Sequence, residues 1–109
     1  MDVNAVRQRT AGIVVFAVTP FLEQGDTTVV DEDGVRRNME LLAASGIPCV
    51  VVCGGVGELW DLTETEHLQV VRAAAQQAAG RMAVYAGVCG DAEGSAARAR
   101  QVEAAGADG

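Results

Sequence analysis

The stretch Pro-Cys-Val-Val-Val-Cys-Gly-Gly-Val-Gly-Glu, residues 48–58, decides the fold, because a short apolar run there ends in a turn rich in glycine. The run is continuous rather than alternating, and this is typical of a strand buried on both faces of a parallel sheet. Two more runs of this kind occupy residues 12–18 and 82–86. The sequence therefore predicts three parallel strands, at 12–18, 48–53 and 82–86.

The segment after the first strand carries the signals of a helix. Asp31 is a favourable N-cap, and the two acidic residues that follow it suit the positive end of the helix dipole. Val35, Met39 and Leu42 follow at helical spacing and form one apolar face. Gly46 is expected to end this helix, since glycine is common just past a helix terminus.

Two further helices are predicted, one after each later strand. Thr63 and Glu66 make a capping-box pattern at the start of the second helix, which Gly80 ends. The third helix runs from about residue 91 to 105 and closes at Gly106. The side chains expected to face the core are Leu68, Val71, Ala75 and Ala78 in the second helix, and Ala99 and Val102 in the third.

The predicted elements alternate as β-α-β-α-β-α, with a strand starting about every 35 residues. This order is typical of an α/β fold with a parallel sheet. No linker or shift in composition divides the chain, so residues 1–109 are expected to belong to a single domain. Residues 105–109 resemble the approach to a fourth strand, and three βα units leave two sheet edges unpaired.

The composition excludes several classes of function. Half of the residues are hydrophobic but only 4% are aromatic, so the chain is not of the disordered type and its core must be aliphatic. The net charge of −7 excludes the electrostatic footprint of a nucleic-acid-binding or anionic-membrane-binding domain. All eight basic residues are arginine, so this chain holds neither a Schiff-base lysine nor the lysine of a phosphate-binding P-loop.

The three cysteines are expected to be free thiols. Cys49 and Cys53 lie in one apolar run, about 13 Å apart along a strand, which is too far to share a metal ion. We therefore expect no metal site and no cofactor. The first ten residues are polar and no apolar stretch approaches the ~20 residues of a membrane helix, so a cytoplasmic protein is expected.

Function in parallel α/β folds gathers at the carboxyl ends of the strands. The glycine-rich segment 54–58 lies at such an end, and successive amides in a turn of this kind can form an anion-binding nest for a carboxylate or phosphate. A tight turn with no ligand explains the same glycines, so both interpretations stay open. Glu58 is either an acid or base, or a residue that organises the loop.

The other chemistry-bearing side chains are expected to be structural. His67 lies in the first turns of a helix with no nucleophile that can be placed beside it, so we expect a solvated surface residue. Cys89 has no cation among its sequence neighbours to activate the thiol, and it is not expected to react. Trp60 is expected to cover the glycine loop, and Tyr85 to belong to the core.

Together these motifs resemble the dihydrodipicolinate synthase/N-acetylneuraminate lyase family. The resemblance rests on Thr19-Pro20-Phe21, on the segment 54–58 followed by Leu62-Thr63, on Gly80-Arg81, and on residues 104–109, in that order and spacing. It covers about residues 12–109. The form of the glycine loop is most similar to the sugar-acid dehydratase branch of the family.

The resemblance implies a (βα)8 TIM barrel, of which this chain covers about the first three βα units. It also implies a class I lyase, acting through a Schiff base on 2-keto acids such as pyruvate or keto-sugar acids, in a homo-oligomeric parent. The family's lysine and tyrosine positions lie beyond Gly109, so no catalytic residue is assigned within this chain. The residues implied to bind substrate are Gly55 and Val56, which hold the carboxylate, with Gly54, Gly57 and Glu58 shaping the loop and Thr19 on the neighbouring rim.

One residue departs from the family pattern, because Val56 stands where the family usually carries threonine. Valine keeps the backbone amide but loses a hydroxyl, and a hydrogen bond to a charged group contributes roughly 1.5–3 kcal/mol. Without lysine, the chain alone is expected to be inactive. The alternatives are a non-catalytic half-barrel module that self-associates or pairs with a separate C-terminal half, and a small phosphate-binding domain.

Overall fold

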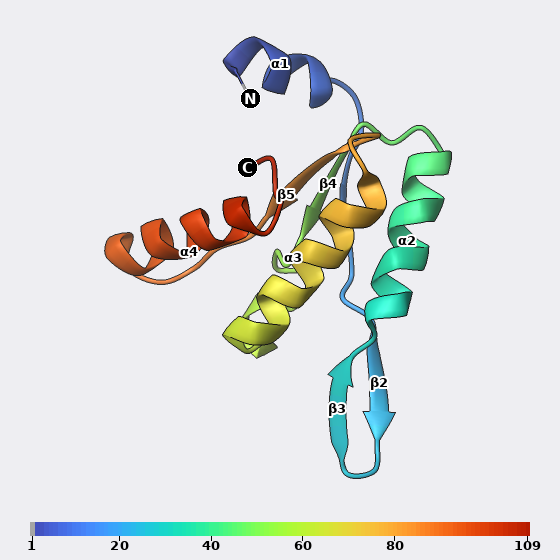
Figure 1. Ribbon diagram of the computed structural model, residues 1–109, viewed down its shortest axis with the longest axis vertical. Coiled ribbons are helices and arrows are strands. Elements are labelled where there is room, and N and C mark those ends of the chain that lie inside the picture. The colour runs from blue at the N-terminus through green and yellow to red at the C-terminus, as the bar shows by residue number, and fades with distance from the viewer. Residues whose placement is uncertain (1) are drawn as a thin grey trace.

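A computed structural model describes residues 2–109 and contains a three-stranded parallel sheet and a separate two-stranded hairpin (Figure 1). The parallel strands are β1 (Val14–Phe16), β4 (Cys49–Val52) and β5 (Ala83–Ala86), in the order β1-β4-β5. Val50 in the central strand pairs with Val15 on one side and Val84 on the other. The three predicted strands are thus confirmed, each within its predicted range.

The three predicted helices are α2 (Glu32–Ala44), α3 (Glu64–Ala78) and α4 (Ala92–Ala104). Asp31 caps α2 by accepting the Gly34 amide at 2.9 Å, and both bonds of the capping box between Thr63 and Glu66 start α3. In Figure 1, α3 passes in front of the sheet and α2 and α4 lie on either side of it. The helices therefore cover one face of the sheet.

The core lies between that face and α2 and α3. Because α3 turns small side chains such as Ala74 and Ala78 toward the sheet, the helix can approach it closely. Burial of each large aliphatic side chain contributes roughly 1.5–3 kcal/mol. The most deeply buried large side chains are Met39, Met82, Val50, Val70, Val71, Val84, Cys49 and Cys53.

Three predictions about burial are wrong. Ala99 is exposed although Val102 is buried, because that side of α4 borders an open cavity shared with Ala86 and Val88 rather than the core. β1 is not buried on both faces either, since Phe16 is 57% exposed. The helices cover only one face of the sheet, and Phe16 lies on the other. Tyr85 was expected in the core but is only half-buried and lies outside it, and this partial burial raises the pKa of its phenol.

The last described residues hydrogen-bond along β5 at the edge where the sequence predicts the approach to a fourth strand, although they form no strand of their own. The Asp108 amide donates to the Val84 carbonyl at 2.7 Å, and the Ala86 amide donates to the Gly109 carbonyl at 2.9 Å. Asp108 also pairs with Arg9 at 3.3 Å, and this contact joins α1 (Val3–Arg9) to the same end of the sheet. The helix α1 was not expected from the sequence.

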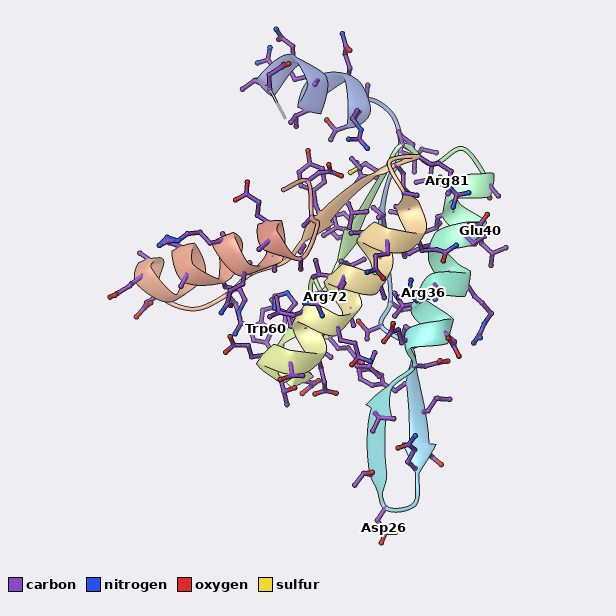
Figure 2. All side chains as sticks on the ribbon, in the orientation of Figure 1. Asp26, Arg36, Glu40, Trp60, Arg72 and Arg81 are labelled. Carbon is purple, nitrogen blue, oxygen red and sulfur yellow. The ribbon has the colours of Figure 1, made fainter. Side chains whose placement is uncertain are left out.

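The hairpin of β2 (Phe21–Gln24) and β3 (Thr27–Val30) was also not expected. A two-residue Gly25-Asp26 turn joins the strands, and Gly25 adopts the positive φ of +59° that such turns require. The turn and the β-branched run after it are a recognisable hairpin signal. The hairpin projects from the body of the molecule with Asp26 at its tip (Figure 2).

Polar side chains join the exposed sides of α2 and α3, which lie side by side. Arg36 donates to Glu32 and to Gln76, both at 2.8 Å. Glu40 accepts two hydrogen bonds from Arg81, at 3.0 and 2.5 Å, at the end of the same interface (Figure 2). The Arg81 guanidinium holds the pKa of the Glu40 carboxyl at about 2, well below its usual value of 4.5.

This depressed pKa predicts that Glu40 contributes to acid sensitivity. A carboxyl with a lowered pKa in the folded state stabilises it fully above its unfolded pKa, and the stabilisation is lost as pH falls from about 4.5 toward 2. We expect the free energy of unfolding, measured in urea, to fall less steeply between pH 4.5 and pH 2 in Glu40→Gln than in the wild type. Glu23→Gln, on the exposed hairpin, should show the same pH dependence as the wild type. Equal acid profiles for the two variants would contradict this role.

Candidate functional site

The segment Gly54–Glu58 follows β4 and forms a tight loop between two residues of left-handed backbone. Cys53 and Glu58 have φ values of +51° and +59°, which non-glycine residues rarely adopt. Such strained conformations cluster at functional sites and persist only where the surroundings enforce them. The loop then leads into the short 3-10 helix η1 (Leu59–Asp61).

Hydrogen bonds engage the Gly54 and Gly55 carbonyls of the loop, whereas Glu58 is the one residue of the loop whose amide donates to another described residue. The Gly54 carbonyl accepts the Leu59 amide at 3.2 Å, and the Gly55 carbonyl accepts the Glu58 amide at 3.1 Å. The amides of Gly55 and Val56 make no hydrogen bond to any residue in the range 2–109, and both residues are exposed. The loop therefore presents hydrogen-bond donors to solvent, which is the arrangement that an anion requires.

Two glycines allow the loop to pack closely against the neighbouring strands. A Cβ on Gly57 would lie 2.8 Å from the Cys53 amide nitrogen, and a Cβ on Gly87 would lie 2.2 Å from the Cys53 carbonyl oxygen. Side chains at these positions would push apart the ends of β4 and β5. The glycines thus fix the loop by contact rather than by flexibility.

Thr19 is buried, with 6% of its surface exposed, and its hydroxyl donates to the Gly57 carbonyl at 2.7 Å. This bond links the end of β1 to the loop after β4, 38 residues later in the chain. The hydroxyl is thereby engaged inside the protein. The structure gives Thr19 a part in holding the loop.

Val56 and Trp60 lie on the open side of the loop. Val56 is 54% exposed, with its apolar side chain at the rim where its free amide also lies. The Trp60 ring comes within 3.7 Å of the Cβ position of Gly55, so this side chain covers part of the loop, as the sequence predicted (Figure 2). Glu58 is exposed, and its backbone carries the turn by donating to Gly55 and accepting from Asp61.

His67 is not a solvated surface residue, contrary to expectation. It is 3% exposed, because the first turn of α3 packs under the loop that follows β5. Burial lowers the pKa of its imidazole, the charge of Arg98 lowers it further, and a hydrogen bond to the backbone of Gly87 partly opposes both effects. Sequence reasoning missed this because only the fold places these residues around the helix.

The cysteines divide into two groups. Cys49 and Cys53 are buried free thiols, as predicted, and burial raises the pKa of Cys53 to about 12. Cys89 is exposed, and it borders a small cavity together with His67 and Arg98. A cation and an imidazole, which are absent from the sequence neighbours of Cys89, therefore border the same cavity: Arg98 comes from α4 and His67 from α3.

Two classes of site are not found among residues 2–109. These residues do not gather three or more His, Cys, Asp or Glu side chains in an arrangement that fits a metal ion. None of their helices combines the length and the apolar character that a membrane crossing requires.

The fold and the loop define a class of protein: a parallel α/β barrel in which a glycine loop with free amides follows the second barrel strand. The chain matches the model of the Dihydrodipicolinate synthetase family over residues 9–109. It belongs to this family. Its three parallel βα units are those of a (βα)8 TIM barrel.

Individual relatives carry more than one name. The chain is 34% identical over 106 residues to a probable 5-dehydro-4-deoxyglucarate dehydratase of Bacillus subtilis, covering 97% of this chain and 33% of the relative. It is 36% identical to a 4-hydroxy-tetrahydrodipicolinate synthase of Methanospirillum hungatei, covering 90% and 34%. A dihydrodipicolinate synthase structure from Acinetobacter baumannii, complexed with pyruvate, aligns with a TM-score of 0.81 at 27% identity, covering 91% and 33%. The chain thus spans about a third of the length of these relatives.

The buried bond of Thr19 predicts a measurable loss on its removal. Thr19→Val keeps the shape but leaves the Gly57 carbonyl without its donor, which should lower the free energy of unfolding by about 1–3 kcal/mol. Thr19→Ser should recover most of this loss. Thr27→Val is a matched control, because the Thr27 hydroxyl donates to a backbone carbonyl on the exposed hairpin, and its effect should stay within about 0.5 kcal/mol. Equal losses at Thr19 and Thr27 in urea unfolding would contradict the assignment.

Proposed function

We propose that this chain supplies the carboxylate-binding part of a class I lyase that acts on 2-keto acids through a Schiff base. The observation that carries the proposal is that the exposed residues Gly55 and Val56 have free amides, in a loop whose Gly54, Gly55 and Gly57 carbonyls accept hydrogen bonds within the protein. A carboxylate oxygen accepts hydrogen bonds from such amides. The pyruvate complex of the Acinetobacter baumannii relative supports the choice of ligand class.

The remaining parts of the proposal follow from family membership. The substrate is pyruvate or a keto-sugar acid, and the reaction is aldol-type cleavage or condensation, or dehydration. Relatives named as dehydratases and as synthases support both subtypes. Residues 1–109 form one part of a single barrel with no internal boundary, the whole barrel is a cytoplasmic homo-oligomer, and no cofactor is needed.

Within this chain, the residues have distinct parts in the proposed site. Gly55 and Val56 donate their amides to the substrate carboxylate. Thr19 and Gly57 hold the loop in the conformation that exposes those amides, and Cys53 packs against the neighbouring strand to fix its position. The Schiff base of this class of lyase needs a lysine side chain, which this chain lacks, so the chain alone binds the substrate without converting it.

A non-catalytic module that self-associates or pairs with a separate C-terminal half is the second candidate. The observation that favours it is the set of exposed apolar side chains Val14 and Phe16 in β1 and Val18 just after it. A module of this kind has no use for the free amides. The two candidates therefore differ in whether 2-keto acids bind to the glycine loop.

Pyruvate binding to the chain alone tests the loop directly. We expect the amide resonances of Gly55 and Val56 to shift on titration with pyruvate, and the fluorescence of Trp60, the single tryptophan, to change with them. Methyl pyruvate, which lacks the negative charge, is the matched control and should leave both signals in place. Shifts with inorganic phosphate but not with pyruvate would favour a phosphate-binding domain, and no shift with either would favour the non-catalytic module.

Replacing Val56 with threonine, which supplies the hydroxyl usual in the family, should increase activity. In a chimera that carries residues 9–109 in place of the matching third of the Bacillus subtilis dehydratase, Val56→Thr should raise kcat/KM by about tenfold or more. Val88→Thr is the control, because Val88 borders the α4 cavity rather than the loop, and it should leave kcat/KM unchanged.

The same chimera locates the missing amine. Borohydride in the presence of the keto acid should trap an adduct on the chimera, whereas the isolated chain should carry none within residues 2–109. A stable adduct inside that range of the isolated chain would contradict the proposed division of roles.

A further inference from the structure

A small cavity of about 80 Å³ lies outside the glycine loop, beside η1 and between the start of α3 and the middle of α4. Polar and charged groups make up much of its lining, in contrast to the apolar core nearby. The lining residues are Leu59, Leu62, Thr63, Glu64, His67, Cys89 and Arg98. Neither the proposed carboxylate site nor the core packing uses this space.

Two buried polar atoms of the lining have no hydrogen-bond partner within residues 2–109. They are Nε2 of His67 and Nη1 of Arg98. The depressed pKa of His67 keeps its imidazole neutral, and its bond to the Gly87 backbone leaves Nε2 as an acceptor. Nη1 of Arg98 is a donor, while Nη2 of the same side chain pairs with Glu64 at 3.2 Å. An unpaired buried polar group costs free energy, so the two atoms together call for a group that both donates and accepts.

Cys89 is the cysteine that reaches this cavity, and it is exposed to solvent. We propose that Cys89 is a site of reversible oxidation by hydroperoxides, with Arg98 and His67 holding the sulfenic acid that forms. The S–OH group matches the two orphaned atoms, because its oxygen accepts from Nη1 of Arg98 and its hydrogen is donated to Nε2 of His67. This inference is independent of the proposed lyase function.

The chemistry balances with a hydroperoxide as the oxidant. The exposed thiol releases its proton to water, and the thiolate sulfur attacks one oxygen of the peroxide. The S–O bond forms as the O–O bond breaks, the sulfur loses two electrons, and the departing hydroxide takes up a proton to become water. Thiol and hydrogen peroxide thus give sulfenic acid and water, and an added thiol reverses the change through a disulfide.

Labelling with dimedone during hydrogen peroxide treatment of the 109-residue chain tests the site, with mass spectrometry to locate the label. We expect Cys89 to be labelled and the buried Cys49 and Cys53 to remain unlabelled. Arg98→Met should slow the labelling of Cys89 about tenfold, since it removes one charge-assisted hydrogen bond. Arg98→Lys keeps the cation and should recover part of the rate.

Arg100→Met is the matched control, because Arg100 lies two residues further along α4 and borders a different cavity, the one shared with Ala86 and Val88. It should oxidise at the wild-type rate. Without dimedone, sulfinic acid should make up a larger share of the oxidised Cys89 in Arg98→Met than in the wild type, because the sulfenic acid is no longer held. Equal oxidation rates in Arg98→Met, Arg100→Met and the wild type would overturn the proposal, as would labelling of Cys49 or Cys53 as fast as that of Cys89.

Discussion

The hydrogen bond from Thr19 to the Gly57 carbonyl is the contact on which the candidate site depends. It joins the end of β1 to a loop that would otherwise be free to turn its own oxygens outward. Close packing of Cys53 against Gly87 fixes the same loop from the side of β5. These contacts hold the loop in a conformation in which the exposed residues Gly55 and Val56 have unpaired amides. The proposed anion binding thus depends both on the contacts that fix the loop and on the amides that the loop leaves unpaired.

The sheet has one covered face and one open face, and this asymmetry explains several local features. The face toward α2 and α3 holds the aliphatic core, so Val50, Val71 and Met39 are almost completely buried. The opposite face carries Phe16 and Tyr85, which are apolar but only partly covered. In a closed parallel barrel such a face points to the interior, where side chains from neighbouring strands fill the space in layers. The pattern of exposure is therefore that of a barrel wall rather than of a free-standing sandwich.

Local signals in the sequence predicted most of the fold. The strands, the cap at Asp31 and the capping box at Thr63 depend on residues within a few positions of one another, so they can be recognised without the structure. The hairpin around Gly25 also has a local signal, in its Gly25-Asp26 turn and the β-branched residues that follow. The surroundings of His67 had none, because Cys89 and Arg98 come from two other elements and meet it only in the folded chain. The same limit applied to Thr19, whose partner lies 38 residues away.

The hairpin of β2 and β3 has a base that closes on itself, since the Asp31 amide donates to the Pro20 carbonyl at 2.9 Å. The chain leaves the body of the molecule at Pro20 and returns at the cap of α2, with only the buried Val30 and half-buried Phe21 packed near the base. Because Pro20 and Asp31 are joined at the base, a longer or shorter hairpin leaves the spacing between β1 and α2 unchanged. The conformational entropy of the segments outside the hairpin is unchanged as well. Residues 22–29 can therefore be exchanged for a segment of another length or sequence, by evolution or by design, while the parallel sheet stays the same.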